Sequence, residues 1–363
     1  MEVTVLIVGS GPAGLATAAC LEQRRIPYVI VERESCSASL WHHRAYDRLK
    51  LHLAKEFCEL PHMAYPTSTP THVPRERFVE HLESYMDCFG ICPRYCTVVE
   101  SASYNESRRH WVVLTWNVDM GAKVRITTCF LVVATGENSA ASILLFPGFA
   151  RFTREIIHSS AYKSGKGHVG KRVLVVGAGN SGMEIAYDLA THGAHTSIVI
   201  RSPVHIMTKE LIRFGMTLAQ KLPVTIVDVV LVMVANFIFG DMSKHGIRRP
   251  KMGPLFLKSQ TGRSPVIDVG TAKLIKEGAI MVFKGISRID VNNVEFHGGK
   301  KLPFDAINGE SMFTADGFPT RDFPNHWKGE NGLYCAGFAR RGLAGISMDA
   351  KNIADDITAA LNN

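Results

Sequence analysis

Two short stretches indicate the fold: residues 3–14 read VTVLIVGSGPAG, and residues 172–182 read RVLVVGAGNSG. Each is a valine-rich run followed by G-x-G-x-x-G and then by a helical pattern, which is typical of the first strand, turn and helix of a dinucleotide-binding domain. In the first copy Gly9 allows a tight turn, Gly11 lets the backbone approach a pyrophosphate, and Gly14 lets the helix pack close to the strand. The helix N-terminus would then hold the phosphates, because its free N–H groups favour anions. The other residues expected at the two turns are Pro12 and Ala13 in the first, and Gly177, Gly179, Asn180, Ser181 and Gly182 in the second.

The two copies differ in the charge of the residue that ends their next strand. After the first copy, an apolar strand over residues 28–31 ends at Glu32, whose carboxylate can accept hydrogen bonds from a ribose diol. After the second copy, a strand over residues 197–200 ends at Arg201, whose planar guanidinium suits a 2′-phosphate that a carboxylate would repel. We therefore predict FAD or NAD at the first turn and NADPH at the second.

The motifs predict an α/β protein with two Rossmann-like domains. Between the motifs, residues 130–136 are expected to form an apolar strand that closes in an A-T-G turn. In flavoproteins with two dinucleotide-binding domains, a segment of this kind leads from the FAD domain toward the NADPH domain. We expect the FAD-binding domain to be interrupted. Residues 1–168 would begin it, residues 169–285 would form the inserted NADPH-binding domain, and residues 286–363 would complete it.

Composition excludes several other classes of protein. With 363 residues, 46% hydrophobic and 20% charged, the chain has room for two domains and lies near the globular average. Its eight cysteines include no C-x-x-C pair, so we expect neither a metal site nor a dithiol redox centre. The net charge of +8 suits anionic cofactors and substrates, and the lack of an aromatic and basic stripe argues against nucleic-acid binding.

The cellular location is also indicated by the sequence. The N-terminus enters an apolar strand without a basic region or a cleavage site, so we expect a cytoplasmic protein. The most apolar stretch, residues 223–240, contains Asp228 and leaves an uncharged run shorter than the ~20 residues that a membrane span needs. We expect a helix that is buried or docks on a surface, and peripheral contact with the endoplasmic reticulum stays open as an alternative.

Longer stretches carry a family resemblance: SLWHHRAYDRLKLHLAKEFCELP (39–61), VLVVGAGNSGMEIAYDL (173–189) and HWKGENGLYCAGFARRGL (326–343). Before the second glycine motif, Phe152, His158 and Tyr162 match the signature F-x-G-x-x-x-H-x-x-x-[YF]. On these residues the chain resembles the flavin-containing monooxygenases, specifically their plant YUCCA-type branch, over essentially its whole length. The resemblance implies an oxidoreductase that uses FAD, NADPH and O2 to convert a 2-oxo acid, indole-3-pyruvate, to indole-3-acetate in auxin biosynthesis.

The resemblance also implies roles for single residues. Leu40 and Trp41 would pack near the flavin, although a core role is the alternative for the tryptophan. His52 stands where animal and microbial members place an asparagine beside the flavin, which makes it the candidate catalytic residue; a structural histidine is the alternative. The three signature residues would organise the connection between the domains.

Two departures from the family pattern point to another function. Arg154 replaces the signature's glycine, and the chain passes from Ile307 directly to Asn308 where the family has a second A-T-G strand and a linker. A strand of four residues would be shorter than the usual ~5–6, so we expect unpaired backbone groups in a buried sheet and weak retention of FAD. The alternative function is a non-catalytic or uncoupled protein that binds FAD and NADPH.

Overall fold

The computed structural model describes residues 1–137, 139, 146–309 and 324–362. The chain forms two compact units, which we call unit 1 and unit 2. Unit 1 comprises Met1–Arg44, Ala54–Ala140 and Thr314–Asn363, and unit 2 comprises Ala45–Leu53 and Ala141–Phe313. Each unit contains a sheet with parallel strands and helices, so the expected α/β class with two Rossmann-like domains is confirmed.

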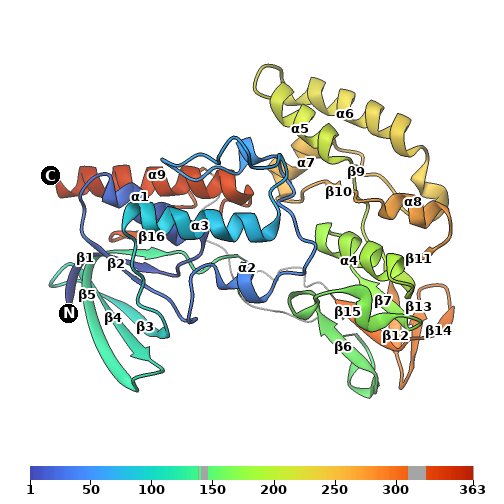
Figure 1. Cartoon of the computed structure of the whole chain (residues 1–363), viewed down its shortest axis with the longest axis horizontal. Helices are drawn as coiled ribbons and strands as arrows, with labels where there is room; N and C mark the ends of the chain where they lie inside the picture. Colours follow the sequence, from blue (N-terminus) through green and yellow to red (C-terminus); the bar gives the residue numbers. More distant parts are fainter. Residues whose placement is uncertain (138, 140–145, 310–323, 363) are drawn as a thin grey trace. The chain divides into compact units, whose positions relative to one another are not determined.

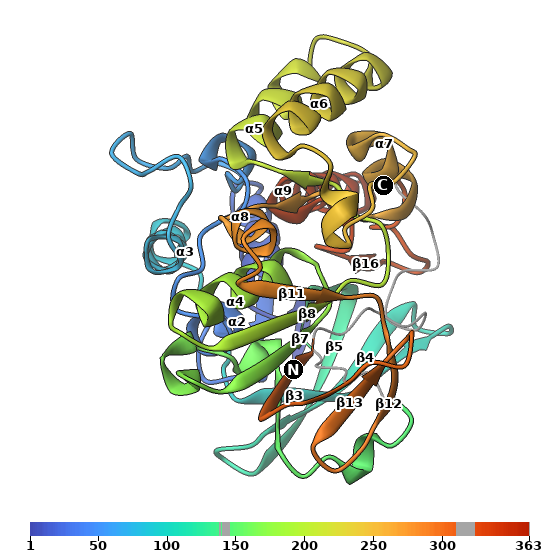
Figure 2. The same cartoon turned by 90° about the vertical axis from the view of Figure 1, so that its right-hand side faces the viewer.

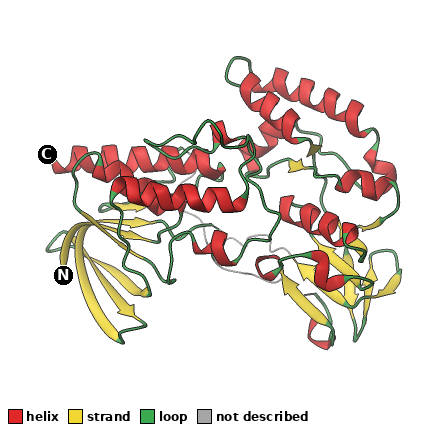
Figure 3. Ribbon diagram, viewed as in Figure 1, coloured by secondary structure: helices red, strands yellow, loops and turns green. Residues whose placement is uncertain are grey.

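Unit 1 is built on a sheet in the order β2-β1-β5-β4-β3, with β16 beside the C-terminal end of β5. Figure 3 shows the strands in yellow and the helices in red. β1 runs parallel to β2 and β5, whereas β4 runs antiparallel to both of its neighbours. The strands are β1 (Glu2–Val8), β2 (Tyr28–Val31), β3 (Thr97–Asn105), β4 (His110–Asn117), β5 (Ala122–Val133) and β16 (Leu333–Cys335).

Three helices of unit 1 pack against one another beside this sheet. The apolar helix α1 contacts both α3 and α9, and Figure 1 shows the three running side by side. Burial on several sides explains why α1 is apolar all round, with every residue from Ala13 to Leu21 buried. The helices of unit 1 are α1 (Pro12–Glu22), α2 (Ser39–His43), α3 (Arg75–Phe89) and α9 (Gly342–Leu361), with a 3₁₀ turn at Lys55–Phe57.

Unit 2 is built on a five-stranded parallel sheet in the order β11-β8-β7-β15-β6. Figure 2 shows β11, β8 and β7 of this sheet side by side. Two smaller sheets accompany it, the antiparallel β12-β13-β14 and the parallel pair β9-β10. The strands are β6 (Glu155–His158), β7 (Arg172–Val176), β8 (His195–Val199), β9 (Ile206–Met207), β10 (Val266–Ile267), β11 (Ile280–Phe283), β12 (Ile286–Ile289), β13 (Asn293–Phe296), β14 (Lys301–Pro303) and β15 (Ala306–Gly309). The helices are α4 (Asn180–Thr191), α5 (Lys209–Leu218), α6 (Val224–Phe239), α7 (Pro254–Thr261) and α8 (Thr271–Lys276), with 3₁₀ turns at Phe149–Arg151, Ser159–Ala161, Gly165–His168 and Met242–His245.

The boundaries of the units differ from those expected for the two domains. β6 falls in the segment 1–168 and β12 to β15 fall in the segment 286–363, both assigned from sequence to the first domain, yet all five strands belong to unit 2. Their pairing explains this, since β15 lies between β6 and β7 in one sheet. The short segment Ala45–Leu53 also belongs to unit 2.

The expectation of an incomplete sheet after Ile307 is wrong. β15 pairs in parallel with β6 over Glu155–His158 and with β7 over Val173–Val176, and Ile307 is 2% exposed. Four residues suffice because β6 itself has only four residues and β7 only five. The residues after Gly309 where a longer strand would continue, 310–323, lie outside the described part of the chain.

The apolar stretch 223–240 forms helix α6, which is buried on one face and exposed on the other. The carboxylate of Asp228 is buried and accepts the backbone N–H groups of Leu255 (2.8 Å) and Phe256 (3.0 Å) at the start of α7. The opposite face exposes 68% of Val229 and 92% of Phe237. Among the described helices, none has the length and apolar character needed to cross a membrane.

Candidate nucleotide-binding sites

The first glycine turn is closed by contacts that only glycine permits. Gly9 has φ +104° and donates its N–H to the carbonyl of Val31 at 2.8 Å. A Cβ on Gly9 would lie 2.5 Å from the carbonyl oxygen of Ala134, and a Cβ on Gly14 would lie 1.9 Å from the carbonyl oxygen of Gly9. These two glycines therefore serve the packing of β1, α1 and the end of β5.

Gly11 has a different role, because a Cβ there would meet no atom within 4 Å. It precedes α1 at the N-cap position with φ −72° and makes no side-chain capping bond, and Pro12 occupies the first turn. The amide groups of this first turn lack intrahelical acceptors, which makes the N-terminus of α1 suited to an anion. The open space at Gly11 is what a pyrophosphate lying against the backbone requires, so the turn fits a dinucleotide such as FAD.

Glu32 lies against this turn, as its place after β2 predicts. One carboxylate oxygen accepts from the backbone N–H of Ser10 at 2.7 Å and from its hydroxyl at 3.0 Å. The other oxygen accepts from the backbone N–H of Glu34 at 2.9 Å. Since a carboxylate can accept about four hydrogen bonds, Glu32 keeps capacity for a ligand. Its contact with a ribose stays a prediction.

Helix α2 begins beside the same turn. The backbone N–H of Ala38, the residue before α2, donates to the carbonyl of Ser10 at 3.1 Å. Leu40 and Trp41 are both half-buried, and the Trp41 ring packs edge-on against Phe78 with centroids 4.6 Å apart. The tryptophan thus has a packing role, and its role beside a flavin stays a prediction.

Sequence reasoning missed a buried group at the return of the chain to this turn. A Cβ on Gly337, which has φ +87°, would lie 2.9 Å from the Cβ of Ala13 in the first turn of α1. The N–H of Gly337 donates to Asp349 at 3.0 Å, and the other carboxylate oxygen of Asp349 lies 3.0 Å from Nε2 of His326. Burial raises the pKa of Asp349. Gly337, the first glycine of the stretch CAGFARRGL, was the signal in the sequence that could have indicated this close approach.

The second glycine turn repeats this geometry in unit 2. Gly177 has φ +111° and donates its N–H to the carbonyl of Val199 at 3.2 Å, while Gly179 caps α4 with φ −73°. Oδ1 of Asn180 accepts from the backbone N–H of Ile267 in β10 at 2.8 Å, which leaves the amide nitrogen of its side chain to donate to a ligand. The remaining predicted residues are Ser181, which is half-buried, Gly182, which is buried, and Arg201, which is exposed beyond the end of β8.

Two buried acids on α4 hold the segment Ala45–Leu53 in unit 2. Glu184 is 2% exposed, and its Oε1 lies 3.6 Å from Nε2 of His52. Asp188 is 6% exposed, and its Oδ1 lies 3.9 Å from Nη1 of Arg48, whose guanidinium also stacks over Tyr187 at 4.5 Å. The candidate catalytic histidine therefore lies against the helix that follows the second glycine turn.

Neighbouring groups stabilise the ionised form of Glu184. Burial alone would raise its pKa. This effect is outweighed by the hydrogen bonding and charge of His52, by the hydroxyl of Tyr46 and by the charge of Lys209, so the pKa of Glu184 lies below its usual value. Burial lowers the pKa of Lys209, and the charge of Glu184 opposes that shift. Sequence reasoning missed Glu184 and Asp188, although acids four residues apart on an otherwise apolar helix are a usable signal.

The three signature residues are structural in unit 2. Phe152 is buried in a cluster with Leu174, and the Tyr162 hydroxyl donates to Oδ2 of Asp188 at 2.6 Å. Nδ1 of His158 lies 2.8 Å from the hydroxyl of Ser160. Arg154, the departure from the signature, is exposed and is not among the described residues with positive φ, so its backbone does not need glycine there.

Comparison with known proteins decides the family. Residues 6–212 match the Pyridine nucleotide-disulphide oxidoreductase family. The chain is 48% identical to the probable indole-3-pyruvate monooxygenase YUCCA10 of Arabidopsis thaliana, over 99% of this chain and 98% of that one. It is 43% identical to the indole-3-pyruvate monooxygenase YUCCA1 of rice, over 97% and 90%. The chain belongs to the YUCCA family of monooxygenases. A YUCCA-family chain is a flavin-dependent oxidoreductase, so the predicted enzyme class is confirmed.

Solved structures agree with this YUCCA-family fold. A flavin-containing monooxygenase from Stenotrophomonas maltophilia superposes with a TM-score of 0.75 at 17% identity, covering 99% of both chains. An oxidized steroid monooxygenase bound to NADP superposes with a TM-score of 0.74 at 16% identity, covering 100% of this chain and 85% of that one. The alignment with YUCCA10 spans 377 positions, so that relative contains residues that this 363-residue chain lacks.

Proposed function

We propose that this chain converts indole-3-pyruvate to indole-3-acetate and CO2 with NADPH and O2, using FAD, as a step of auxin biosynthesis. The main support is the pair of strand, glycine turn and helix motifs, followed by an acid in one copy and a base in the other. The 48% identity to YUCCA10 over nearly the whole chain supports the substrate. A non-catalytic or uncoupled binder is not favoured, because β15, the short strand that motivated this alternative, is paired on both sides.

The first turn would hold FAD. The N–H groups at the start of α1 would bind the pyrophosphate in the space beside Gly11, and Glu32 would accept from the ribose hydroxyls. Gly9 and Gly14 would shape the turn, and Ala13 would lie under the phosphates. When bound, the flavin supplies the two-electron and oxygen chemistry that no side chain can perform.

The second turn would hold NADPH. Ser181 and the side-chain nitrogen of Asn180 would contact the phosphates at the start of α4, and Arg201 would bind the 2′-phosphate with its guanidinium. The Ile267 bond to Asn180 would fix the orientation of that side chain.

His52 would act in the chemical step through its free ring nitrogen. Glu184 is buried and ionised beside Nε2, which favours a proton on that nitrogen and leaves Nδ1 available to a ligand. Glu184 is then a positioning residue. Leu40 and Trp41 would exclude water from the flavin, which limits the loss of reduced oxygen as hydrogen peroxide.

The test of the proposal is turnover by the FAD-loaded protein. Purified protein with NADPH and indole-3-pyruvate should form indole-3-acetate, whereas His52→Ala should lower the yield of indole-3-acetate per NADPH consumed. With catalase present to remove hydrogen peroxide, which itself decarboxylates 2-oxo acids, an uncoupled oxidase would instead consume NADPH without forming indole-3-acetate. A binder would keep its flavin oxidised in the presence of NADPH.

We also propose that the protein is cytoplasmic and contacts a membrane surface, such as that of the endoplasmic reticulum, through α6. The exposed face carries Val229, Met233 and Phe237, and exposed Lys221 and Lys244 flank the helix, which suits an anionic bilayer. Phe237→Ser should reduce co-sedimentation with phosphatidylserine vesicles, while Met120→Ser, a change at a residue 82% exposed in unit 1, should not. Equal binding by both variants would contradict this proposal.

A further inference from the structure

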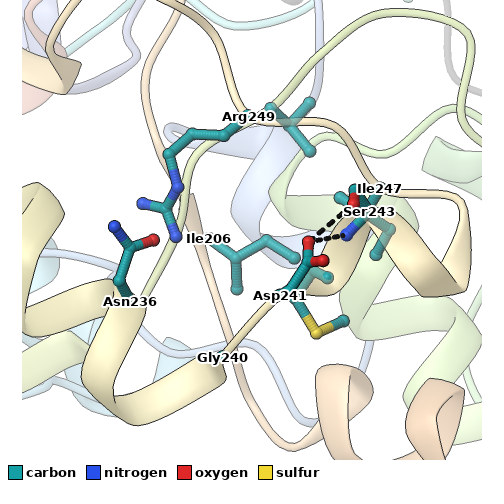
Figure 4. A pocket seen from close by; sticks show the side chains of 9 residues that line it. Ile206, Asn236, Gly240, Asp241, Ser243, Ile247 and Arg249 are labelled. Carbon is teal, nitrogen blue, oxygen red and sulfur yellow. Dashed lines mark hydrogen bonds between the residues drawn. The ribbon is translucent and has the colours of Figure 1, made fainter.

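Unit 2 contains a pocket of about 450 Å³ that includes no residue of either glycine turn. Its walls come from β9 and Val204 just before it, from the end of α6, and from the turn and following segment after α6 (Figure 4). The lining residues are Val204, Ile206, Asn236, Gly240, Asp241, Met242, Ser243, Ile247 and Arg249. This volume falls in the range of about 300–1,000 Å³ that small-molecule sites occupy.

The pocket contains a guanidinium with unused donor capacity. Nη1 of Arg249 is buried and has no hydrogen-bond partner among the described residues. Figure 4 shows this guanidinium and the side-chain amide of Asn236 turned toward one another on one side of the pocket. Burial lowers the pKa of Arg249, yet an arginine stays charged in proteins. A buried charged donor without an acceptor is costly, which favours an anionic ligand at this place.

The other titratable groups around the pocket do not neutralise Arg249. Asp241 is exposed, and its Oδ1 accepts from both the N–H (3.0 Å) and the hydroxyl (2.6 Å) of Ser243, away from the guanidinium in Figure 4. His205 is buried next to the lining strand and lies 2.8 Å from the carbonyl of Met252 through Nε2. Burial lowers the pKa of His205, so this ring is neutral near pH 7.

The rest of the wall is apolar and firmly held. Ile206, Met242 and Ile247 are each at most 7% exposed. The backbone N–H of Val204 donates to the carbonyl of Arg248 at 2.9 Å, which ties the strand carrying Ile206 to the segment carrying Arg249. A ligand for this pocket therefore needs one anionic end and an apolar body.

We propose that this pocket binds small organic carboxylates with an aromatic or aliphatic body. The carboxylate is held by Arg249 and by the amide of Asn236, and the body packs on Ile206, Met242 and Ile247. A bidentate guanidinium contact matches the geometry of a carboxylate, and the uncharged amide of the same acid loses this contact.

The test is calorimetric titration of the oxidised, FAD-loaded protein with phenylacetate and with its neutral counterpart phenylacetamide. NADPH is absent, so the outcome does not depend on turnover or on the identity of the substrate. We expect phenylacetate to bind, and the affinity for phenylacetamide to be lower by about tenfold or more. The reason is that a hydrogen bond to a charged group contributes ~1.5–3 kcal/mol, and each 1.4 kcal/mol is tenfold in affinity.

Variants assign the binding to the pocket. Arg249→Gln should weaken phenylacetate binding about tenfold or more, and Arg249→Lys should weaken it less. The matched control is Arg248→Gln, which removes the same charge from the exposed neighbouring residue and should change the affinity less than twofold. Circular dichroism melting reports whether each variant is folded. The proposal is overturned if phenylacetate does not bind at millimolar concentration, if both glutamine variants bind alike, or if acid and amide bind equally.

Discussion

A methyl group at Gly11 tests the FAD assignment without disturbing the fold. Gly11 has φ −72° and ψ −179°, which alanine adopts without strain, and its Cβ would meet no atom within 4 Å. The free energy of unfolding of Gly11→Ala should therefore stay within about 0.5 kcal/mol of the parent value. A phosphate that accepts from the first turn of α1 lies ~2.9 Å from an amide nitrogen, so the methyl group would displace it. We expect the affinity for FAD to fall about tenfold or more, or ~1.4 kcal/mol.

Gly14→Ala is the matched variant with the opposite profile. Its Cβ would lie 1.9 Å from the carbonyl oxygen of Gly9, so α1 must move away from the turn. Overpacking of this kind costs ~1–3 kcal/mol, and we expect a lower melting temperature together with loss of flavin.

The assay measures the flavin absorbance per chain after gel filtration and the melting temperature with and without added FAD. If Gly11→Ala keeps its flavin as tightly as the parent protein, the pyrophosphate does not lie at this turn and the assignment is refuted. If Gly14→Ala melts like the parent, the close contact of α1 with Gly9 is refuted.

Three further predictions concern other parts of the chain. Arg201→Ala should reduce the preference for NADPH over NADH in flavin reduction by ~10–100-fold. If NADPH and NADH reduce the flavin of the parent protein equally fast, this prediction is contradicted. The pKa of Glu184 is lowered from 4.5, so its ionised form stabilises the fold above about pH 4.5. This stabilisation disappears as the pH falls through the folded-state pKa. The melting temperature of Glu184→Gln should therefore lie below that of the parent protein at pH 7 and approach it in acid. Ile307→Ala should lower the free energy of unfolding by ~2–5 kcal/mol because Ile307 is 2% exposed in β15, and a loss under 1 kcal/mol in urea titration would show that β15 is not a core strand.

The two nucleotide turns could be predicted from sequence because their determinants are local. A glycine with positive φ, a helix that starts three residues later and a charged residue at the end of the next strand all lie within one unit of strand, turn, helix and strand. Glu32 and Gly9 are accordingly where the pattern predicted them, at the first turn.

The parts that sequence reasoning missed depend on contacts between distant segments. The pairing of β15 with both β6 and β7 decides that a four-residue strand is sufficient, and the lengths of those partners are not visible at Ile307. The position of His52 depends on Glu184, whose burial follows from the packing of α4. The boundaries of the two units shifted for the same reason, because β6 joins its sheet through strands far along the chain.

The most direct test of the proposed reaction is its stoichiometry in the presence of catalase. Hydrogen peroxide released by an uncoupled flavin can decarboxylate a 2-oxo acid in solution, and catalase removes that route. With FAD-loaded protein, indole-3-pyruvate and catalase, we predict one indole-3-acetate and one CO2 for each NADPH oxidised, with one atom of ¹⁸O from ¹⁸O2 in the acid. Oxidation of NADPH that yields no indole-3-acetate under these conditions would contradict the proposed monooxygenase reaction.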